Sequence, residues 1–184
     1  MNMKKVGLLF ALLGWSLTLA QGSFVGVVQD SKAFVAVVVA ADQKAIAYVC
    51  DSETVAQWFT GRVGADGVLQ LNNTSSTGGT IQARLNQGEV VGSFTLPGQA
   101  VKAFMAKVAS GTAGLYRYDG TIEGSRYLGG WIVDQQGVQR GSVIGGGSLR
   151  ASVLIPQTLL SDHPRLTNLK AWRVTPEWVS ENLR

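Results

Sequence analysis

TIQARLNQGEVVGSFTL, residues 80–96, carries the clearest structural signal in the chain. Ile81, Ala83 and Leu85 alternate with polar residues in its first half, and apolar residues and one glycine recur at every second position in its second half. A strand that places one face on an apolar core and the other in water has this period of two. Because Asn86-Gln87-Gly88 between the halves is typical of a tight turn, the stretch predicts an antiparallel β-hairpin.

Runs of the same kind extend from residue 23 to residue 145, separated by turns rich in Gly, Asn, Asp and Ser. We count roughly ten such short strands with brief connections, a spacing typical of an antiparallel meander. The sequence predicts an all-β domain in which this meander closes into a barrel, with a two-sheet β-sandwich as the alternative. No alternation of strands with helical patterns occurs, which argues against a parallel sheet.

Glycines recur near the centres of the predicted strands, at Gly26, Gly61, Gly92 and Gly141. A glycine inside a strand weakens it, so such a residue often marks a bend or a close approach of two backbones. Repeated at strand centres, these glycines favour a small, strongly curled barrel.

Two neighbouring apolar runs, AFVAVVVAA at 33–41 and AIAYVC at 45–50, predict a hairpin that is buried on both faces. Residues 100–108 fit either a helix or a strand, and we favour a strand because hairpins surround them. Cys50 ends the second apolar run, so we predict that it is a small buried hydrophobe. As the only cysteine, it cannot form an intramolecular disulfide.

The first twenty residues have the three parts of a secretory signal peptide. Lys4 and Lys5 precede a charge-free apolar run, residues 6–20, that ends on Thr18-Leu19-Ala20. The run of about 15 residues is shorter than the roughly 20 that span a bilayer. We therefore predict a signal peptide over 1–20, export across a bacterial inner membrane and a secreted or periplasmic location. The alternative is an uncleaved membrane anchor.

The charge balance excludes some classes of partner. The whole chain has 16 Lys and Arg residues against 12 Asp and Glu residues, a formal net charge of +4. Without Lys4 and Lys5 the basic count falls to 14 and the net charge to +2. This value is too small to indicate nucleic acid or an anionic membrane surface as a partner. After cleavage, no transmembrane span is predicted.

A glycine-rich break divides the rest of the chain. Gly145-Gly146-Gly147-Ser148 predicts a flexible connection. The predicted organisation is a signal peptide (1–20), a barrel-like β-domain (23–145) and the break with a C-terminal tail (146–184).

The tail is predicted to contain a short helix. Thr175 and Pro176 have the pattern of a helix start, with Thr175 as the cap. Trp178, Val179 and Leu183 follow, and leaving so much apolar surface in water is unfavourable. We therefore expect this segment to pack on the barrel.

Two blocks of sequence support a resemblance. The first is AFVAVVV (33–39), YVCD (48–51) and WFTG (58–61); the second is GLYRY (114–118), GWIV (130–133) and GVQRG (137–141). Together they resemble a group of uncharacterised secreted bacterial proteins, some of them lipoproteins. The resemblance covers about residues 24–145 and implies no activity and no catalytic residue. The chain differs from the lipoprotein members because it lacks a Cys at the predicted cleavage point, and it adds the tail after Gly147.

Residues that could perform catalysis or bind a metal are scarce. The chain has one His, His163, and one Cys, Cys50, whereas a zinc site needs three or four ligands. No Asp-rich calcium loop occurs, so we predict no metal and no cofactor. The one enzymatic alternative is a cysteine hydrolase in which Cys50 attacks, His163 is the base, and Asp51 or Asp162 orients it. An apolar strand disfavours the thiolate that this mechanism needs.

The stretch YRYDGTIEGSRY, residues 116–127, combines tyrosines with arginines and carboxylates. Tyr and Arg are enriched at binding hot spots, although an exposed hairpin with solvated charges has the same composition. We predict that five residues lie near a ligand site: Trp58, Tyr116, Arg117, Tyr118 and Trp131.

These features lead to a functional hypothesis and an alternative. The leading hypothesis is an exported, non-enzymatic β-domain that binds a small apolar ligand or a partner protein at the cell envelope, because barrel mouths are common ligand sites. The alternative is a structural envelope protein whose barrel presents the C-terminal tail to another protein.

Overall fold

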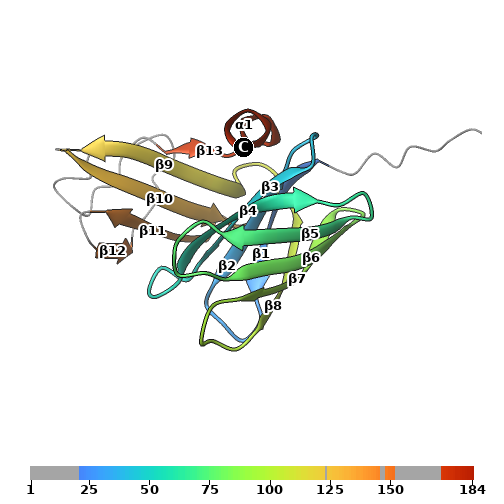
Figure 1. Cartoon of the computed structure of the whole chain (residues 1–184), viewed down its shortest axis with the longest axis horizontal. Helices are drawn as coiled ribbons and strands as arrows, with labels where there is room; N and C mark the ends of the chain where they lie inside the picture. The colour runs from blue at the N-terminus through green and yellow to red at the C-terminus, as the bar shows by residue number, and fades with distance from the viewer. Residues whose placement is uncertain (1–20, 123, 146–147, 152–170) are drawn as a thin grey trace, which may run out of the picture.

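The computed structural model describes residues 21–122, 124–145, 148–151 and 171–184. Within them the chain forms a closed eight-stranded barrel, a second sheet of five strands and one short helix (Figure 1). The barrel strands follow in chain order: β1 (Gly22–Val28), β2 (Phe34–Val39), β3 (Lys44–Cys50), β4 (Ala56–Val63), β5 (Val68–Asn73), β6 (Thr80–Asn86), β7 (Glu89–Thr95) and β8 (Lys102–Val108). The predicted signal peptide, residues 1–20, lies outside the described residues, as does His163.

Every strand of the barrel pairs antiparallel with its neighbours in sequence, and β1 pairs with β8 to close it. The predicted all-β antiparallel barrel is therefore confirmed, and the strand interpretation of residues 100–108 is correct. The predicted number of barrel strands was wrong: the barrel closes after eight strands, whereas roughly ten were predicted from the sequence. An eight-stranded barrel has an interior just wide enough for side chains to fill, and the apolar side chains of these eight strands fill it.

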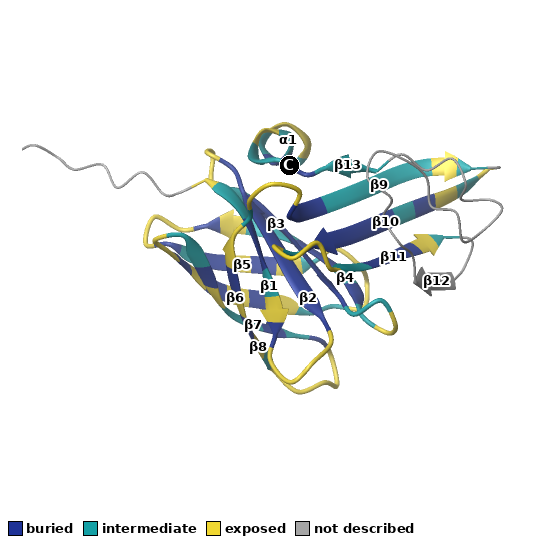
Figure 2. Cartoon of the chain, turned by 180° about the vertical axis from the view of Figure 1, so that it is seen from behind, coloured by how far each residue is buried: buried dark blue, intermediate teal, exposed yellow. Residues whose placement is uncertain are grey.

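The chain leaves the barrel after β8 and forms the second sheet, whose strand order is β12-β11-β10-β9-β13. Its strands are β9 (Gly114–Ile122), β10 (Ser125–Val133), β11 (Gln139–Gly145), β12 (Ser148–Ala151) and β13 (Trp172–Arg173). One end of this sheet packs against the barrel, and the β9–β10 hairpin projects beyond it (Figures 1 and 2). The C-terminal segment therefore adds an edge strand to the sheet, next to β9.

Two apolar layers share the strands β2 and β3. Val35, Val37 and Val49 point into the barrel, whereas Ala36, Val38 and other outward residues pack under the second sheet and the helix. Every residue of β2 is buried, and so is every residue of β3 except Lys44 (Figure 2). The far wall of the barrel has no such cover, and β6 alternates strictly between exposed and buried residues. The predicted burial of the 33–50 hairpin on both faces is confirmed.

Helix α1 (Pro176–Asn182) lies beside strand β13, next to the barrel (Figure 1). Its residues Trp178 and Asn182 line a cleft between the barrel and the second sheet. Thr175 is its N-cap, and the side-chain oxygen of Thr175 accepts a hydrogen bond from the backbone amide of Trp178 at 3.3 Å. Pro176 opens the helix, where its missing amide proton is not needed. Val179 is fully buried in the apolar layer outside β2 and β3. The predicted helix start and its packing on the barrel are both confirmed.

Candidate functional site

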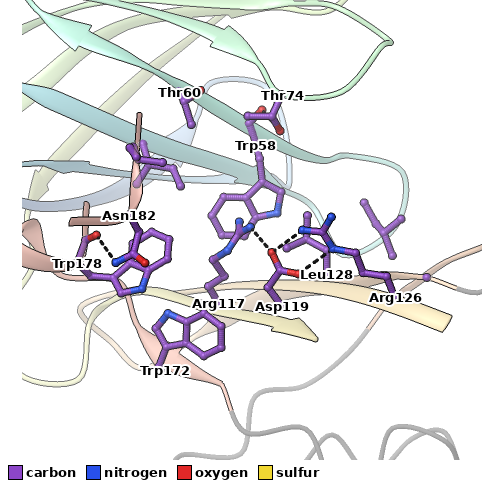
Figure 3. Close-up of a pocket in the computed structure, with 14 residues that line it drawn as sticks. Trp58, Thr60, Thr74, Arg117, Asp119, Arg126, Leu128, Trp172, Trp178 and Asn182 are labelled. Atoms are coloured by element: carbon purple, nitrogen blue, oxygen red, sulfur yellow. Dashed lines mark hydrogen bonds and ion pairs between the residues drawn. The ribbon is translucent and has the colours of Figure 1, made fainter. Parts of the chain in front are cut away.

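A cleft with a volume of about 760 Å³ lies where the barrel, the second sheet and α1 meet. Its apolar lining includes three indoles and several aliphatic side chains: Trp58, Trp172, Trp178, Ile46, Leu128, Ile144 and Leu183. Its polar lining is smaller: Thr60, Thr74, Arg117, Asp119, Arg126 and Asn182. The cleft is thus mostly apolar, and the charged side chains of Arg117, Asp119 and Arg126 lie together within it (Figure 3).

Trp58 projects from the outer face of β4 into the base of the cleft. Its ring packs on Tyr48 of β3, with 4.4 Å between the ring centroids. The guanidinium of Arg117 lies over the Trp58 ring at 4.5 Å and is also 5.9 Å from the centroid of Trp178. A guanidinium at such a distance from an aromatic ring is attracted to its π face. Arg117 therefore joins the barrel, the second sheet and the helix at one point.

Arg117 also belongs to a charged triad with Asp119 and Arg126 (Figure 3). One oxygen of the Asp119 carboxylate accepts from Arg126 Nε, and the other accepts from Nη2 of both arginines, all at 2.9 Å. The side chain of Arg117 is 15% exposed and that of Arg126 is 74% exposed. The triad therefore runs from the buried base of the cleft to its open rim.

The triad shifts the pKa values of its members. The hydrogen bond from Arg126, followed by that from Arg117, holds the pKa of Asp119 below its usual value, although partial burial opposes this effect. Burial lowers the pKa of Arg117, and its hydrogen bond and charge attraction to Asp119 oppose that shift. Asp119 is thus ionised at neutral pH, and the triad carries one net positive charge.

The lowered pKa of Asp119 predicts a pH dependence of stability. A carboxyl whose pKa is depressed by folding stabilises the protein above its unfolded pKa of about 3.9, and this contribution disappears as the pH falls through the folded value. We expect Asp119→Asn to lower the free energy of unfolding at pH 7, and the difference from the wild type to shrink below about pH 4. Denaturant unfolding at several pH values measures this, and a difference that stays constant down to pH 2.5 would contradict it.

The five residues predicted to lie near a ligand site fall on two faces of the second sheet. Trp58 and Arg117 line the cleft together. Tyr116, Tyr118 and Trp131 pack instead in the apolar cluster on the opposite face of the sheet. Successive side chains of a strand point to opposite faces, so Arg117 and its two tyrosine neighbours cannot share a site. The hydroxyl of Tyr116 donates to the carbonyl of Thr112 at 2.7 Å.

The cleft also contains residues that the sequence did not single out as a site. Asp119 and Arg126 lie in the charged stretch already noted, and Trp172 and Trp178 come from the C-terminal tail. Only the fold brings these segments together, through the pairing of β13 with β9. The indole nitrogen of Trp172 is buried and has no hydrogen-bond partner among the described residues.

Cys50 is fully buried, as predicted. Its sulfur lies 3.5 Å from the hydroxyl of Ser142 and accepts a hydrogen bond from the backbone amide of Ser52 at 3.3 Å. In the described part of the chain, no group of three or more His, Cys, Asp or Glu side chains could hold a metal ion. Nor is any helix there long and apolar enough to cross a membrane.

Comparisons of this chain with known protein families, curated proteins and solved structures gave no match.

Proposed function

We propose that this protein is an exported binding domain whose cleft between the barrel and the second sheet holds a small apolar ligand. The observation that carries the proposal is the convergence of three indoles and a charged triad in a cleft of about 760 Å³. Small-molecule sites are typically clefts of about 300 to 1,000 Å³ with an apolar lining and a few placed polar groups. The cleft has both properties.

The packing of the barrel interior indicates that the ligand site is the cleft and not the mouth of the barrel. Phe24, Phe59, Phe94 and Phe104 are among the side chains that fill the barrel interior. An interior packed in this way is a core rather than a pore. A ligand is therefore better accommodated outside the barrel, against the outer face of β3 and β4.

The position of residues 171–184, the described C-terminal part of the tail, argues against the alternative in which the barrel presents the tail to another protein. Val174 and Val179 are fully buried, and Trp178 and Leu183 are partly buried against the same apolar layer. The tail helix thus contributes one wall of the cleft. Export remains a prediction from the pattern of residues 1–20.

Binding of the neutral apolar fluorophore N-phenyl-1-naphthylamine tests the proposal. Leu128→Trp adds bulk to the lining of the cleft, so we expect it to weaken probe binding at least about tenfold, as a steric block of a small-molecule site should. Val91→Trp places the same side chain on the exposed face of β7, outside the cleft, and should bind like the wild type.

Thr60→Trp is a second cleft variant, to be used if Leu128→Trp does not fold. Equal probe affinity in the wild type and a folded cleft variant would exclude the cleft as the site. Absence of probe binding by the wild type would overturn the proposed function.

A further inference from the structure

We infer that the ligand is a long-chain carboxylate, whose acidic group pairs with Arg126 at the rim while its chain lies along the indoles. This inference rests on the proposed function of the cleft. It follows from the charge and the hydrogen-bonding groups that the described lining leaves unmatched.

The charges that line the cleft do not balance. Among the described residues that line it, Arg117, Asp119 and Arg126 are the charged ones, and they sum to one positive charge. Both oxygens of Asp119 are already used by the two guanidiniums. A ligand that brings a single negative charge would neutralise the site.

The unmatched polar atoms are mainly donors. Arg117 uses only Nη2 in hydrogen bonds within the described structure, and Arg126 uses only Nε and Nη2. The indole Nε1 of Trp172, which can only donate, is buried without a partner there. The N–H groups that the two guanidiniums leave unused favour a ligand that supplies acceptor oxygens. A carboxylate supplies two such oxygens and matches the planar fork of a guanidinium.

A carboxylate fits this site better than a phosphate monoester. The monoester carries about −1.5 to −2 charges at pH 7, more than the single positive charge of the triad. Arg126 offers the accessible end of the triad, since its side chain is mostly exposed whereas that of Arg117 is mostly buried. The carboxylate therefore lies at the rim, beside Arg126.

The rest of the lining accommodates an apolar chain. Leu128, Trp178 and Leu183 lie along the cleft and belong to the apolar layer between the barrel and the second sheet. Leu183 is the C-cap of α1. Leu128 of β10 and Trp178 of α1 lie on either side of Trp58 and Arg117 (Figure 3). An acyl chain laid between them would bury apolar surface from both partners, which is the main source of affinity for such ligands.

Calorimetric titration with dodecanoate and with the neutral analogue dodecanol tests the inference. We expect the wild type to bind dodecanoate about tenfold more tightly than dodecanol, the scale of one charge-assisted hydrogen bond. Arg126→Gln should bring the ratio of the dodecanoate and dodecanol affinities close to one, and Arg126→Lys should restore part of the preference. Arg84→Gln removes an exposed arginine of β6 outside the cleft and should leave the preference intact.

Four outcomes distinguish the inference from the proposed function. Equal binding of dodecanoate and dodecanol overturns the acidic head group and leaves the apolar cleft in place. Tighter binding of dodecyl phosphate than of dodecanoate overturns the carboxylate. If the protein binds N-phenyl-1-naphthylamine but none of the three dodecyl compounds, the inference of an acyl ligand is overturned and the proposed function stands. If none of these ligands binds, the proposed function is overturned as well.

Discussion

Gly26→Ala is expected to destabilise the protein by about 3 kcal/mol or more, because it inserts a methyl group where two backbones touch. A Cβ atom on Gly26 would overlap the carbonyl oxygen of Met105 and lie 2.6 Å from the Cα of Ala106. Both neighbours belong to β8, the strand that closes the barrel against β1. Since backbone cannot move aside as a flexible side chain can, the barrel would have to open at this seam.

Gly22→Ala is the matched control in the same strand. The nearest atom to a Cβ at Gly22 is Cζ of Phe24 at 3.5 Å, an ordinary contact distance. We expect its free energy of unfolding to stay within about 0.5 kcal/mol of the wild type. Denaturant unfolding compares the two variants, and similar stability for both would show that the close approach of β1 and β8 is absent in solution.

Gly130→Val is expected to separate the second sheet from the barrel. A Cβ atom on Gly130 would lie 2.6 Å from Cζ of Tyr48 and 2.7 Å from Cζ2 of Trp58. Both rings are almost completely buried and packed on each other, so neither can swing away. We expect a loss of about 3 kcal/mol in the free energy of unfolding and loss of ligand binding in the cleft.

Thr121→Val is the control for this prediction, because it introduces the same residue at an exposed position of the neighbouring strand β9. Denaturant unfolding and titration with N-phenyl-1-naphthylamine measure the two expected effects. A Gly130→Val variant with wild-type stability and wild-type probe affinity would contradict the packing of Gly130 on Tyr48 and Trp58.

The fold class could be predicted from the sequence, because the alternation of apolar and polar residues along a strand shows which faces of that strand are covered. The strict alternation of β6 corresponds to one wet face, and the unbroken apolar runs of β2 and β3 correspond to cover on both sides. Three of the four glycines at strand centres had the predicted meaning, since Cβ atoms at Gly26, Gly61 and Gly92 would all collide with backbone of a neighbouring strand. Gly141 was wrongly assigned to the barrel: it lies in β11 of the second sheet, where a Cβ atom would meet the ring of Trp131. These are local features that a sequence displays directly.

The division between barrel and second sheet could not be predicted in this way. Strands β9 and β10 have nine residues and β11 has seven, close to the six to eight residues of the barrel strands, so length does not set them apart. Where a meander leaves a barrel depends on how many strands its interior side chains require, which is a property of the whole packing. The C-terminal residues Trp172 and Arg173 join this sheet across a long stretch of chain, and no short-range pattern signals that pairing.

Only two of the residues that line the cleft were singled out from the sequence as ligand-site residues, because the arrangement of the cleft also depends on the whole packing. Trp58 and Arg117 were placed near a ligand and do line the cleft. Tyr116 and Tyr118 flank Arg117 in sequence but face the other side of the sheet, where Trp131 also lies. When both faces of a strand carry large side chains, composition does not reveal which face borders a cleft.

The indole N–H resonances of the folded protein in a ¹H–¹⁵N correlation spectrum, followed during titration with dodecanoate, locate the ligand most directly. Trp58, Trp172 and Trp178 line the cleft, whereas Trp131 is fully buried in the cluster on the other face of the second sheet. We expect the first three resonances to shift together with one affinity and that of Trp131 to stay in place. A shift confined to Trp131, or no shift in any cleft indole at saturating dodecanoate, would contradict a ligand site between the barrel and the second sheet.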